Sequence, residues 1–501
     1  MSTGPNPTVK LRGGRPWTPG DSGDGTSADV LVRDGLVAAV GPEATEATAD
    51  ITLDCGDCVV SPGLVDLHTH LRQPGKEEAE TIESGGRAAA LGGFTAVLAM
   101  PNTTPTIDSA EVVREVLELG RSAPCAVHTS GAITVDRAGE RLAPMAEMAA
   151  LGVSLFTDDG SGVQDDALMR RALEYAGGLG VILAQHCEVT SLSQGTCMHE
   201  GLVSSRLGLS GQPAEAEELM VMRDIALSRL TGTPVHFLHL STARSVDLVR
   251  QAKAAGQAIT AEAAPHHFTL TDEACVGYDP LFKVHPPLRT AADVAAVKVG
   301  LADGTIDAIA TDHAPHTPDS KELPFDQAPP GMLGLEYALA LALTELDLPL
   351  DAVIELLSVR PAAIGRMGEQ GRPVAVGAPA NLCVIDPSAA WPIDDTGGAS
   401  RSRNVPYAGR RVTGKVRHTV CAGEPVVIDG APQRLSLIHI SEPTRLLSTS
   451  YAVFCLKKNR PPRTTQQITS RDSSHQHDAE HTNHQRPTHS YKIEQHPVAL
   501  T

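Results

Sequence analysis

The sequence is poor in positive charge. Its 501 residues include 41 Lys and Arg against 60 Asp and Glu, which gives a formal net charge of −19. Nonspecific binding of nucleic acid needs a basic face, so we expect no nucleic-acid partner. An anionic small molecule would have to bind in a local pocket of positive charge, because the overall electrostatic potential of the protein is negative and repels it.

The sequence also lacks long uninterrupted apolar runs. Residues 1–20 contain no apolar core of the kind that a secretory signal requires. The most apolar helical run, residues 333–350, is interrupted by Glu336, Glu345 and Asp347, which predicts a buried or amphipathic helix and not a membrane span. We therefore expect no membrane partner.

The sequence contains nine cysteines, an odd number, and they are scattered along the chain. Cys55 and Cys58 form a lone CxxC with no second pair, so we interpret them as two small residues of a β-rich segment and not as a zinc or redox site. This usage suits a reducing compartment, and we expect a cytoplasmic protein.

A repeated pattern occupies residues 63–316, where a short apolar run ends in polar residues and is followed by a helical stretch. The runs are GLVDLHTHLR, FTAVLAMPNT, CAVHTSGAIT, VSLFTDDG, VILAQHCE, PVHFLHLST, AITAEAAPHH and DAIATDHAPH. Eight such units predict an α/β fold, a (β/α)8 TIM barrel whose active-site residues lie at the C-terminal ends of its strands. The chain is long enough for this barrel and a smaller domain.

The flanking segments are β-rich and short. Strand-like pieces in residues 8–60 and 374–430 predict that both segments pair into one small β-sandwich domain beside the barrel. We expect bounds of 1–60 and 374–434 for the two parts of this domain and 61–373 for the barrel.

The composition changes again from about residue 435. The stretch LSLIHISEPTRLLSTSYAVFCLKKN resembles the read-through translation of a sequencing-library adapter, and the polar run after it has few core-forming residues. We expect residues 435–501 to be a non-native or disordered tail. Its histidines could bind metal loosely as a His-rich tract, but an inert tail is the favoured interpretation.

Histidines and aspartates gather at the predicted strand ends. The candidates are His68, His70, Asp158 or Asp159, His186, His239 and Asp312. Alternate side chains of a strand point the same way, so His68, His70 and Arg72 would share a face if the first strand extends that far. A catalytic metal pair needs several fixed nitrogen and oxygen ligands and a bridging group. Six candidates at one end of one barrel predict a metal site.

The motifs DLHTHLRQPG, MPNT, FTDDG, QHCE, LHLST and ATDHAPH resemble the amidohydrolase superfamily, most closely the class I dihydroorotases, over about residues 28–430. The resemblance implies two zinc ions, one held by His68, His70 and Asp312 and the other by His186 and His239. It implies that Asp159 bridges them, with Asp158 as the alternative. Related hydantoinases bridge their metals with a carboxylated lysine, and no lysine lies near the fourth predicted strand.

The resemblance further implies the reversible ring closure of N-carbamoyl-L-aspartate to L-dihydroorotate in pyrimidine synthesis. Asp312 would carry the proton, and Arg72 would bind the substrate carboxylate as a bidentate fork. The full set of implied substrate contacts is His70, Leu71, Arg72, Asn102, His285, His316, Pro330 and Gly331, the last two through the backbone. His285 departs from the asparagine that is usual in the family, and Pro330 from a common phenylalanine.

Two alternatives remain open. One is another cyclic amidohydrolase, an allantoinase or hydantoinase, against which Arg72 and the aspartate pair speak. The other is an inactive scaffold subunit for aspartate transcarbamoylase, which should have lost metal ligands that this sequence retains. We expect a homo-oligomer, with aspartate transcarbamoylase as a candidate partner.

Overall fold

The computed structural model describes residues 7–20, 25–394 and 396–433. These belong to a compact unit that spans Met1–Ile438. The tail expected at 435–501, with its histidines, lies outside the described residues. No helix in the described ranges is long and apolar enough to cross a membrane.

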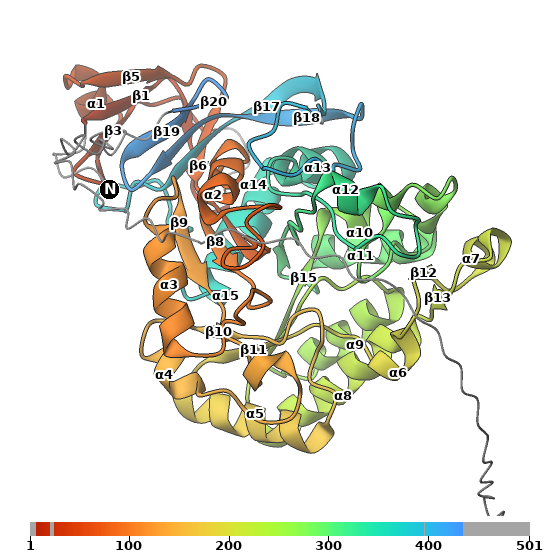
Figure 1. Cartoon of the computed structure of the whole chain (residues 1–501). Coiled ribbons are helices and arrows are strands. Elements are labelled where there is room, and N and C mark those ends of the chain that lie inside the picture. The colour runs from red at the N-terminus through yellow and green to blue at the C-terminus, as the bar shows by residue number, and fades with distance from the viewer. Residues whose placement is uncertain (1–6, 21–24, 395, 434–501) are drawn as a thin grey trace, which may run out of the picture. The chain divides into compact units, whose positions relative to one another are not determined.

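Eight parallel strands form the central barrel (Figure 1). They are β7 (Leu64–Thr69), β8 (Phe94–Ala99), β9 (Ala126–Thr129), β10 (Leu155–Phe156), β11 (Ile182–Gln185), β14 (Val235–Phe237), β15 (Ile259–Ala263) and β16 (Ala308–Ile309). One sheet runs β7-β8-β9 and the other β10-β11-β14-β15-β16. Parallel bridges between Gly131 and Phe156 and between Thr69 and His313 join the two sheets at both edges. The predicted barrel is confirmed, and each predicted run contains one strand.

A helix follows each barrel strand. These are α2 (Ile82–Leu91), α3 (Ala110–Gly120), α4 (Met145–Ala149), α5 (Asp166–Leu179), α8 (Glu215–Thr231), α9 (Ala243–Ala254), α11 (Ala291–Asp303) and α13 (Ala338–Glu345). Their starts are set locally: the Thr81 and Ser84 side chains form a capping box at α2, and the Asp165 carboxylate caps α5. α13 lies in the apolar run and buries its first five side chains, as expected of a buried helix.

Shorter elements connect these units. They are α1 (Pro42–Glu46), η1 (Val135–Arg137), α6 (Thr190–Ser193), β12 (Met198–His199), α7 (Leu202–Leu207), β13 (Gly211–Gln212), α10 (Pro265–Thr269), η2 (Asp272–Cys275), η3 (Pro280–Phe282), α12 (Pro318–Lys321), α14 (Leu350–Ile354), η4 (Glu355–Val359) and α15 (Arg360–Ile364). The barrel interior is filled by apolar side chains, among them Ala96, Leu98, Ala184 and Ala308.

The two chain flanks build one β domain from two sheets. One sheet runs β4-β3-β1-β5 and the other β2-β6-β17-β18-β19-β20. Their strands are β1 (Val9–Arg12), β2 (Arg15–Pro16), β3 (Val30–Arg33), β4 (Leu36–Val40), β5 (Ile51–Asp54), β6 (Val59–Pro62), β17 (Leu382–Pro392), β18 (Arg411–Cys421), β19 (Glu424–Ile428) and β20 (Ala431–Pro432).

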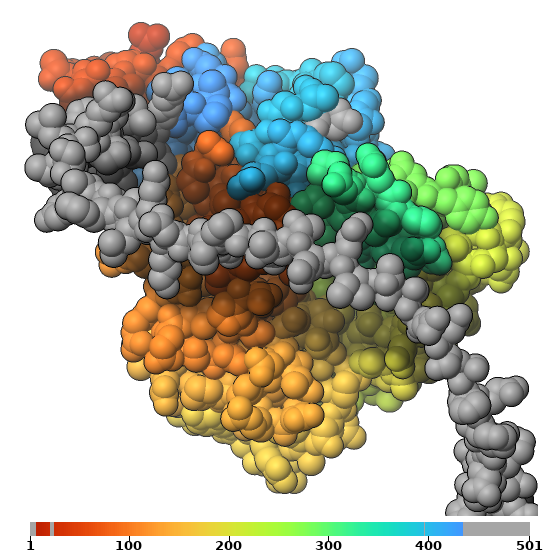
Figure 2. Space-filling view, in the orientation of Figure 1, coloured from red at the N-terminus to blue at the C-terminus, as the bar shows by residue number. Residues whose placement is uncertain are grey.

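The core between these sheets joins sequence-distant residues. Leu11 and Val32 of the first sheet pack with Val60 and Val384 of the second. Figure 2 shows the red N-terminal and blue C-terminal surfaces side by side. The predicted joining of both flanks in one β domain is confirmed, whereas the bounds 1–60, 61–373 and 374–434 stay a prediction.

Candidate active site

A pocket of about 160 Å³ opens where the barrel strands end. It is lined by His70, Arg72, Asn102, Asp159, Gly160, His186, His239, Val284, His285, Asp312, Ala314, His316, Pro330 and Gly331. Two residues expected in the site do not line it. His68 is fully buried beside the pocket, and the Leu71 side chain packs in the hydrophobic core. The expected substrate contact of Leu71 stays a prediction, and because its side chain faces apolar neighbours, such a contact would be made by its backbone.

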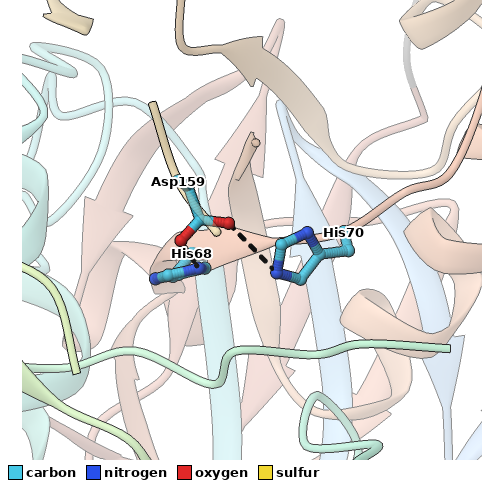
Figure 3. Close-up of side chains that lie close together, drawn as sticks. All are labelled: His68, His70 and Asp159. Carbon is cyan, nitrogen blue, oxygen red and sulfur yellow. Dashed lines mark ion pairs between the residues drawn. The ribbon is translucent and has the colours of Figure 1, made fainter. Parts of the chain in front are cut away.

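The first group of polar side chains gathers at the end of β7. His68 Nε2 lies 3.4 Å from Asp159 Oδ1, and His70 Nε2 lies 3.6 Å from Asp159 Oδ2 (Figure 3). Asp312 Oδ1 lies 3.1 Å from His70 Nε2 and 3.6 Å from His68 Nε2. The ends of β7, β10 and β16, which are far apart in the sequence, thus meet at Asp159.

A second group shares Asp159 with the first. Asp159 Oδ1 lies 3.4 Å from His186 Nδ1 and 3.8 Å from His239 Nε2. The two imidazoles approach within 3.0 Å of each other between these same nitrogens. Among the described residues, two groups have ligand atoms close enough together to hold a metal ion, namely His68, His70 and Asp159, and Asp159, His186 and His239.

The donor set fits a metal. Zinc bonds of 2.0–2.1 Å in tetrahedral geometry place neighbouring ligand atoms roughly 3.3 Å apart, and the separations above cluster around that value. Carboxylate and amide oxygens only accept hydrogen bonds, so Nδ1 of His68 and of His70 carries the proton and each Nε2 offers a lone pair. His68 Nε2 is buried and has no hydrogen-bond partner. With the histidines neutral, lone pairs and carboxylates converge on one space, an arrangement that suits a cation between them.

The structure distinguishes the two neighbouring aspartates. Asp158 Oδ1 accepts hydrogen bonds from the backbone N–H of Ile133 at 2.8 Å and of Thr134 at 3.0 Å. Its carboxylate therefore holds the segment that follows β9. Asp159, one residue on, faces His68 and His70 instead (Figure 3).

Partners of the histidines complete the cluster. His68 Nδ1 donates to Glu262 Oε1 at 2.9 Å, and His70 Nδ1 donates to Asn102 Oδ1 at 2.9 Å. Glu188 Oε2 lies 3.6 Å from His186 Nε2. Such outer partners fix which ring nitrogen faces a metal. Sequence reasoning missed both glutamates; the available signal was a carboxylate within an otherwise apolar strand-end run.

Arg72 reaches the pocket by a turn. The strand does not extend to Arg72, because β7 ends at Thr69 and Arg72 has a φ of 62°, so the condition for a shared strand face is not met. Its Nε donates to Pro315 O at 3.0 Å, and its Nη2 lies 3.3 Å from His316 Nε2. Burial lowers the pKa of Arg72 to about 10, so the guanidinium stays charged at neutral pH.

Two further histidines of the pocket, His316 and His285, are neutral. Burial and the nearby Arg72 lower the pKa of His316 to about 2, and its Nε2 donates to Pro330 O at 2.8 Å. Burial lowers the pKa of His285 to about 4, and its Nε2 has no hydrogen-bond partner. The pocket therefore contains the charged Arg72 and two neutral hydrogen-bonding histidines in addition to the carboxylates of Asp159 and Asp312.

Comparison with known proteins gives a consistent result. The family model described as dihydro-orotase-like matches residues 57–245. The dihydroorotase of Pelotomaculum thermopropionicum is 50% identical over 406 residues, which cover 80% of this chain and 94% of that protein. The dihydroorotase of Mycobacterium tuberculosis is 46% identical over 84% of this chain and 99% of that protein. The solved L-hydantoinase (dihydropyrimidinase) of Arthrobacter aurescens superposes with a TM-score of 0.75 at 24% identity, covering 85% of this chain and 97% of that one, which is a likeness of fold.

Proposed function

The chain belongs to the dihydroorotase family of cyclic amide hydrolases, and we propose that its pocket performs the reversible ring closure of N-carbamoyl-L-aspartate to L-dihydroorotate. The observation that carries the proposal is a single pocket in which a metal-type His and Asp cluster lies beside a buried arginine. The cluster suits amide chemistry, and the arginine suits a substrate that keeps a carboxylate.

The residues present fit two metal ions, which we assign as zinc. His68, His70 and Asp312 would hold one ion, His186 and His239 the other, and Asp159 would contact both. When bound, a zinc pair supplies Lewis-acid polarisation of the amide carbonyl and lowers the pKa of water towards neutrality. Imidazole nitrogen and carboxylate oxygen, without thiolate, are ligands typical of a catalytic zinc site.

Asp312 is the proton carrier in this scheme. Its carboxylate lines the pocket next to His70 and Asp159. In hydrolysis it accepts a proton from the attacking water and passes it to the departing amide nitrogen. In ring closure the same carboxylate accepts the proton from the attacking nitrogen and returns it to the oxygen that leaves.

The substrate carboxylate binds at Arg72. A guanidinium offers two parallel N–H groups to a carboxylate, and burial here strengthens the contact. Asn102 donates one N–H to Asp159 Oδ2 at 3.2 Å and keeps the second for substrate. The unpartnered Nε2 of His285 can take part in one further hydrogen bond, in place of the family's asparagine.

The alternative functions fit the site less well. A hydantoinase has no substrate carboxylate to match Arg72, and an inactive scaffold subunit needs no ligand cluster. The deciding experiment measures hydrolysis of dihydroorotate and of hydantoin spectrophotometrically, with metal content determined on the same sample. Turnover of hydantoin alone, or a metal-free protein without activity, would overturn the proposal.

We further propose a cytoplasmic homo-oligomer, with aspartate transcarbamoylase as a candidate partner. The eight cysteines in the described ranges are all free, which supports a reducing compartment. Light scattering of the purified chain, alone and mixed with the transcarbamoylase from the same source, tests both assemblies. A monomer that stays separate in the mixture would contradict them.

A further inference from the structure

Residues 329–331, Pro-Pro-Gly, form a segment that we name the PPG segment, of which Pro330 and Gly331 line the pocket. Its three successive carbonyls each accept a hydrogen bond from a different side chain. Lys321 Nζ donates to the first at 2.9 Å, His316 Nε2 to the second at 2.8 Å and Asn404 Nδ2 to the third at 3.1 Å. Each of these donor side chains is largely or fully buried.

The PPG segment also has no free backbone N–H group. Its two prolines carry no N–H, and the Gly331 N–H donates to Lys283 O at 2.9 Å. Gly331 has a φ of 144°, and a Cβ there would lie 2.8 Å from His316 Nε2. The segment is therefore held by the protein itself, and a substrate contact through its backbone is limited to the second lone pairs of its carbonyls.

Asn404 belongs to the long connection between β17 and β18, outside the barrel, and is 2% exposed. Its Nδ2 donates to Ala314 O at 2.9 Å as well as to the PPG segment. Its Oδ1 accepts from the His316 N–H at 3.1 Å. Both donors of the amide and one lone pair of its oxygen are used. In Figure 2 the cyan surface of this region adjoins the green surface of the segment after β16.

The residue between these two contacts is Pro315, whose carbonyl accepts from Arg72 Nε. Asn404 thus forms hydrogen bonds with the backbone on both sides of Pro315, whose carbonyl anchors Arg72. The same side chain donates to Gly331 O of the PPG segment, which runs beside residues 313–316. One amide therefore holds the PPG segment against the loop that anchors Arg72.

We propose that Asn404 is a positioning residue for recognition of the substrate carboxylate, contributed by the β domain to the barrel. It acts by holding Arg72 and His316 in place before substrate arrives, which spares the cost of ordering them on binding. The inference rests on the proposed function, since it needs a substrate anion at Arg72. No other side chain of this length combines two donors with one acceptor.

The test compares N404D with a matched control, N381D. Aspartate keeps the acceptor for the His316 N–H but turns a second acceptor towards two carbonyl oxygens. Asn381 is another buried amide of the β domain, 9% exposed, whose Nδ2 donates to Glu369 O and whose Oδ1 accepts from the Ala422 N–H. It lies outside the pocket, so N381D reports the general cost of such a change.

Both variants should lose thermal stability and keep the metal content of the wild type. Only N404D should raise KM for dihydroorotate, by about tenfold or more, with kcat changed by less than about threefold. In an R72M background, N404D should have little further effect on KM, because its target has been removed.

An unchanged KM in folded, metal-loaded N404D would overturn the inference, and so would an equal rise in N381D. If N404D does not fold, Asn404→Ser, which keeps one donor and removes the repulsion, is subjected to the same KM test. A wild-type protein without dihydroorotate turnover would overturn the proposed function and this inference together. Wild-type turnover with an unaffected N404D would overturn the inference alone.

Discussion

Glu262 and His68 form a hydrogen bond of 2.9 Å between Oε1 and Nδ1, with neither side chain exposed to solvent. The second carboxylate oxygen of Glu262 accepts from His236 Nε2 at 3.0 Å. The glutamate therefore lies in the barrel interior with both oxygens used. It fixes the His68 ring so that Nε2 faces Asp159 and Asp312.

Replacing Glu262 by glutamine should weaken metal binding. The amide oxygen can still accept from His68, but the negative charge that makes the imidazole a better ligand is lost. We expect metal affinity to fall by about 10- to 100-fold, as measured by competition with a chromophoric chelator. Glu217→Gln changes another buried carboxylate, one that contacts Ser241 and Thr242, and should leave affinity unchanged. Equal affinities in both variants would contradict a role for Glu262 in orienting His68.

Mutation of Asp158 and mutation of Asp159 should have different effects on metal content and stability. Asp159→Asn removes the charge shared by both ligand groups, so metal content should fall well below that of the wild type. Asp158→Asn replaces one acceptor that holds the backbone of Ile133 and Thr134, so it should lower stability while metal is retained. Metal analysis after gel filtration and a thermal melt distinguish the two results. Metal loss in Asp158→Asn alone would reverse the assignment.

Asp312→Ala should remove a metal ligand and the proton carrier together. Its activity should therefore fall by more than the roughly 10²–10⁴-fold usual for general acid–base catalysis alone. Initial rates of dihydroorotate hydrolysis, measured with added zinc, check the loss. A variant that keeps a tenth of wild-type turnover would rule out this role.

Arg72→Met keeps the bulk of the side chain and removes its charge. Metal content should match the wild type, because no ligand changes. The substrate anion would lose its strongest partner in a partly desolvated pocket, at a cost of roughly 2–5 kcal/mol. That cost corresponds to a fall in kcat/KM of about 30- to several-thousand-fold for dihydroorotate.

A neutral ring provides the control for Arg72. Dihydrouracil lacks the carboxylate, so wild type and Arg72→Met should both process it poorly and at similar rates. Equal losses on both substrates, or loss of metal, would show that Arg72 supports the metal cluster and does not read the carboxylate.

His316 should make the protein less stable in acid. Burial and Arg72 lower its folded pKa to about 2, whereas an unfolded histidine titrates near 6.5. Between these values the unfolded chain binds more protons, so stability falls as pH drops through the window, by up to about 1.4 kcal/mol per pH unit.

His316→Gln removes the titrating group and keeps a hydrogen-bond donor. Its unfolding free energy, from urea titrations between pH 7 and pH 5, should fall less steeply than that of the wild type. Parallel slopes for the two proteins would mean that His316 is protonated in the folded state.

Much of the fold was readable from the sequence because its signals are local. Strands such as β8 appear as continuous apolar runs, since parallel strands are buried on both faces. Polar residues at the ends of such runs must meet at one end of a closed barrel. The histidines and Asp312 were found in this way, and all but His68 line one pocket.

Where the backbone leaves regular structure, local signals failed. Strand alternation would give Arg72 a shared face with His68 and His70 only if the strand reached it, but β7 ends at Thr69 and the left-handed conformation of Arg72 redirects the chain. Alternation also separates Asp158 from Asp159 without saying which one faces inward. That choice depends on how β10 sits in the barrel, which only its neighbours determine.

The sequence by itself determined the barrel and the chemical identity of the ligand cluster, because periodicity and residue type are properties of short segments. Only the tertiary structure decided which groups orient that cluster. Glu262 meets His68 across 194 residues, and Asn404 meets His316 across 88 residues. Such contacts arise when separate strands and the β domain pack together, and a buried polar group leaves no periodic trace in its own segment.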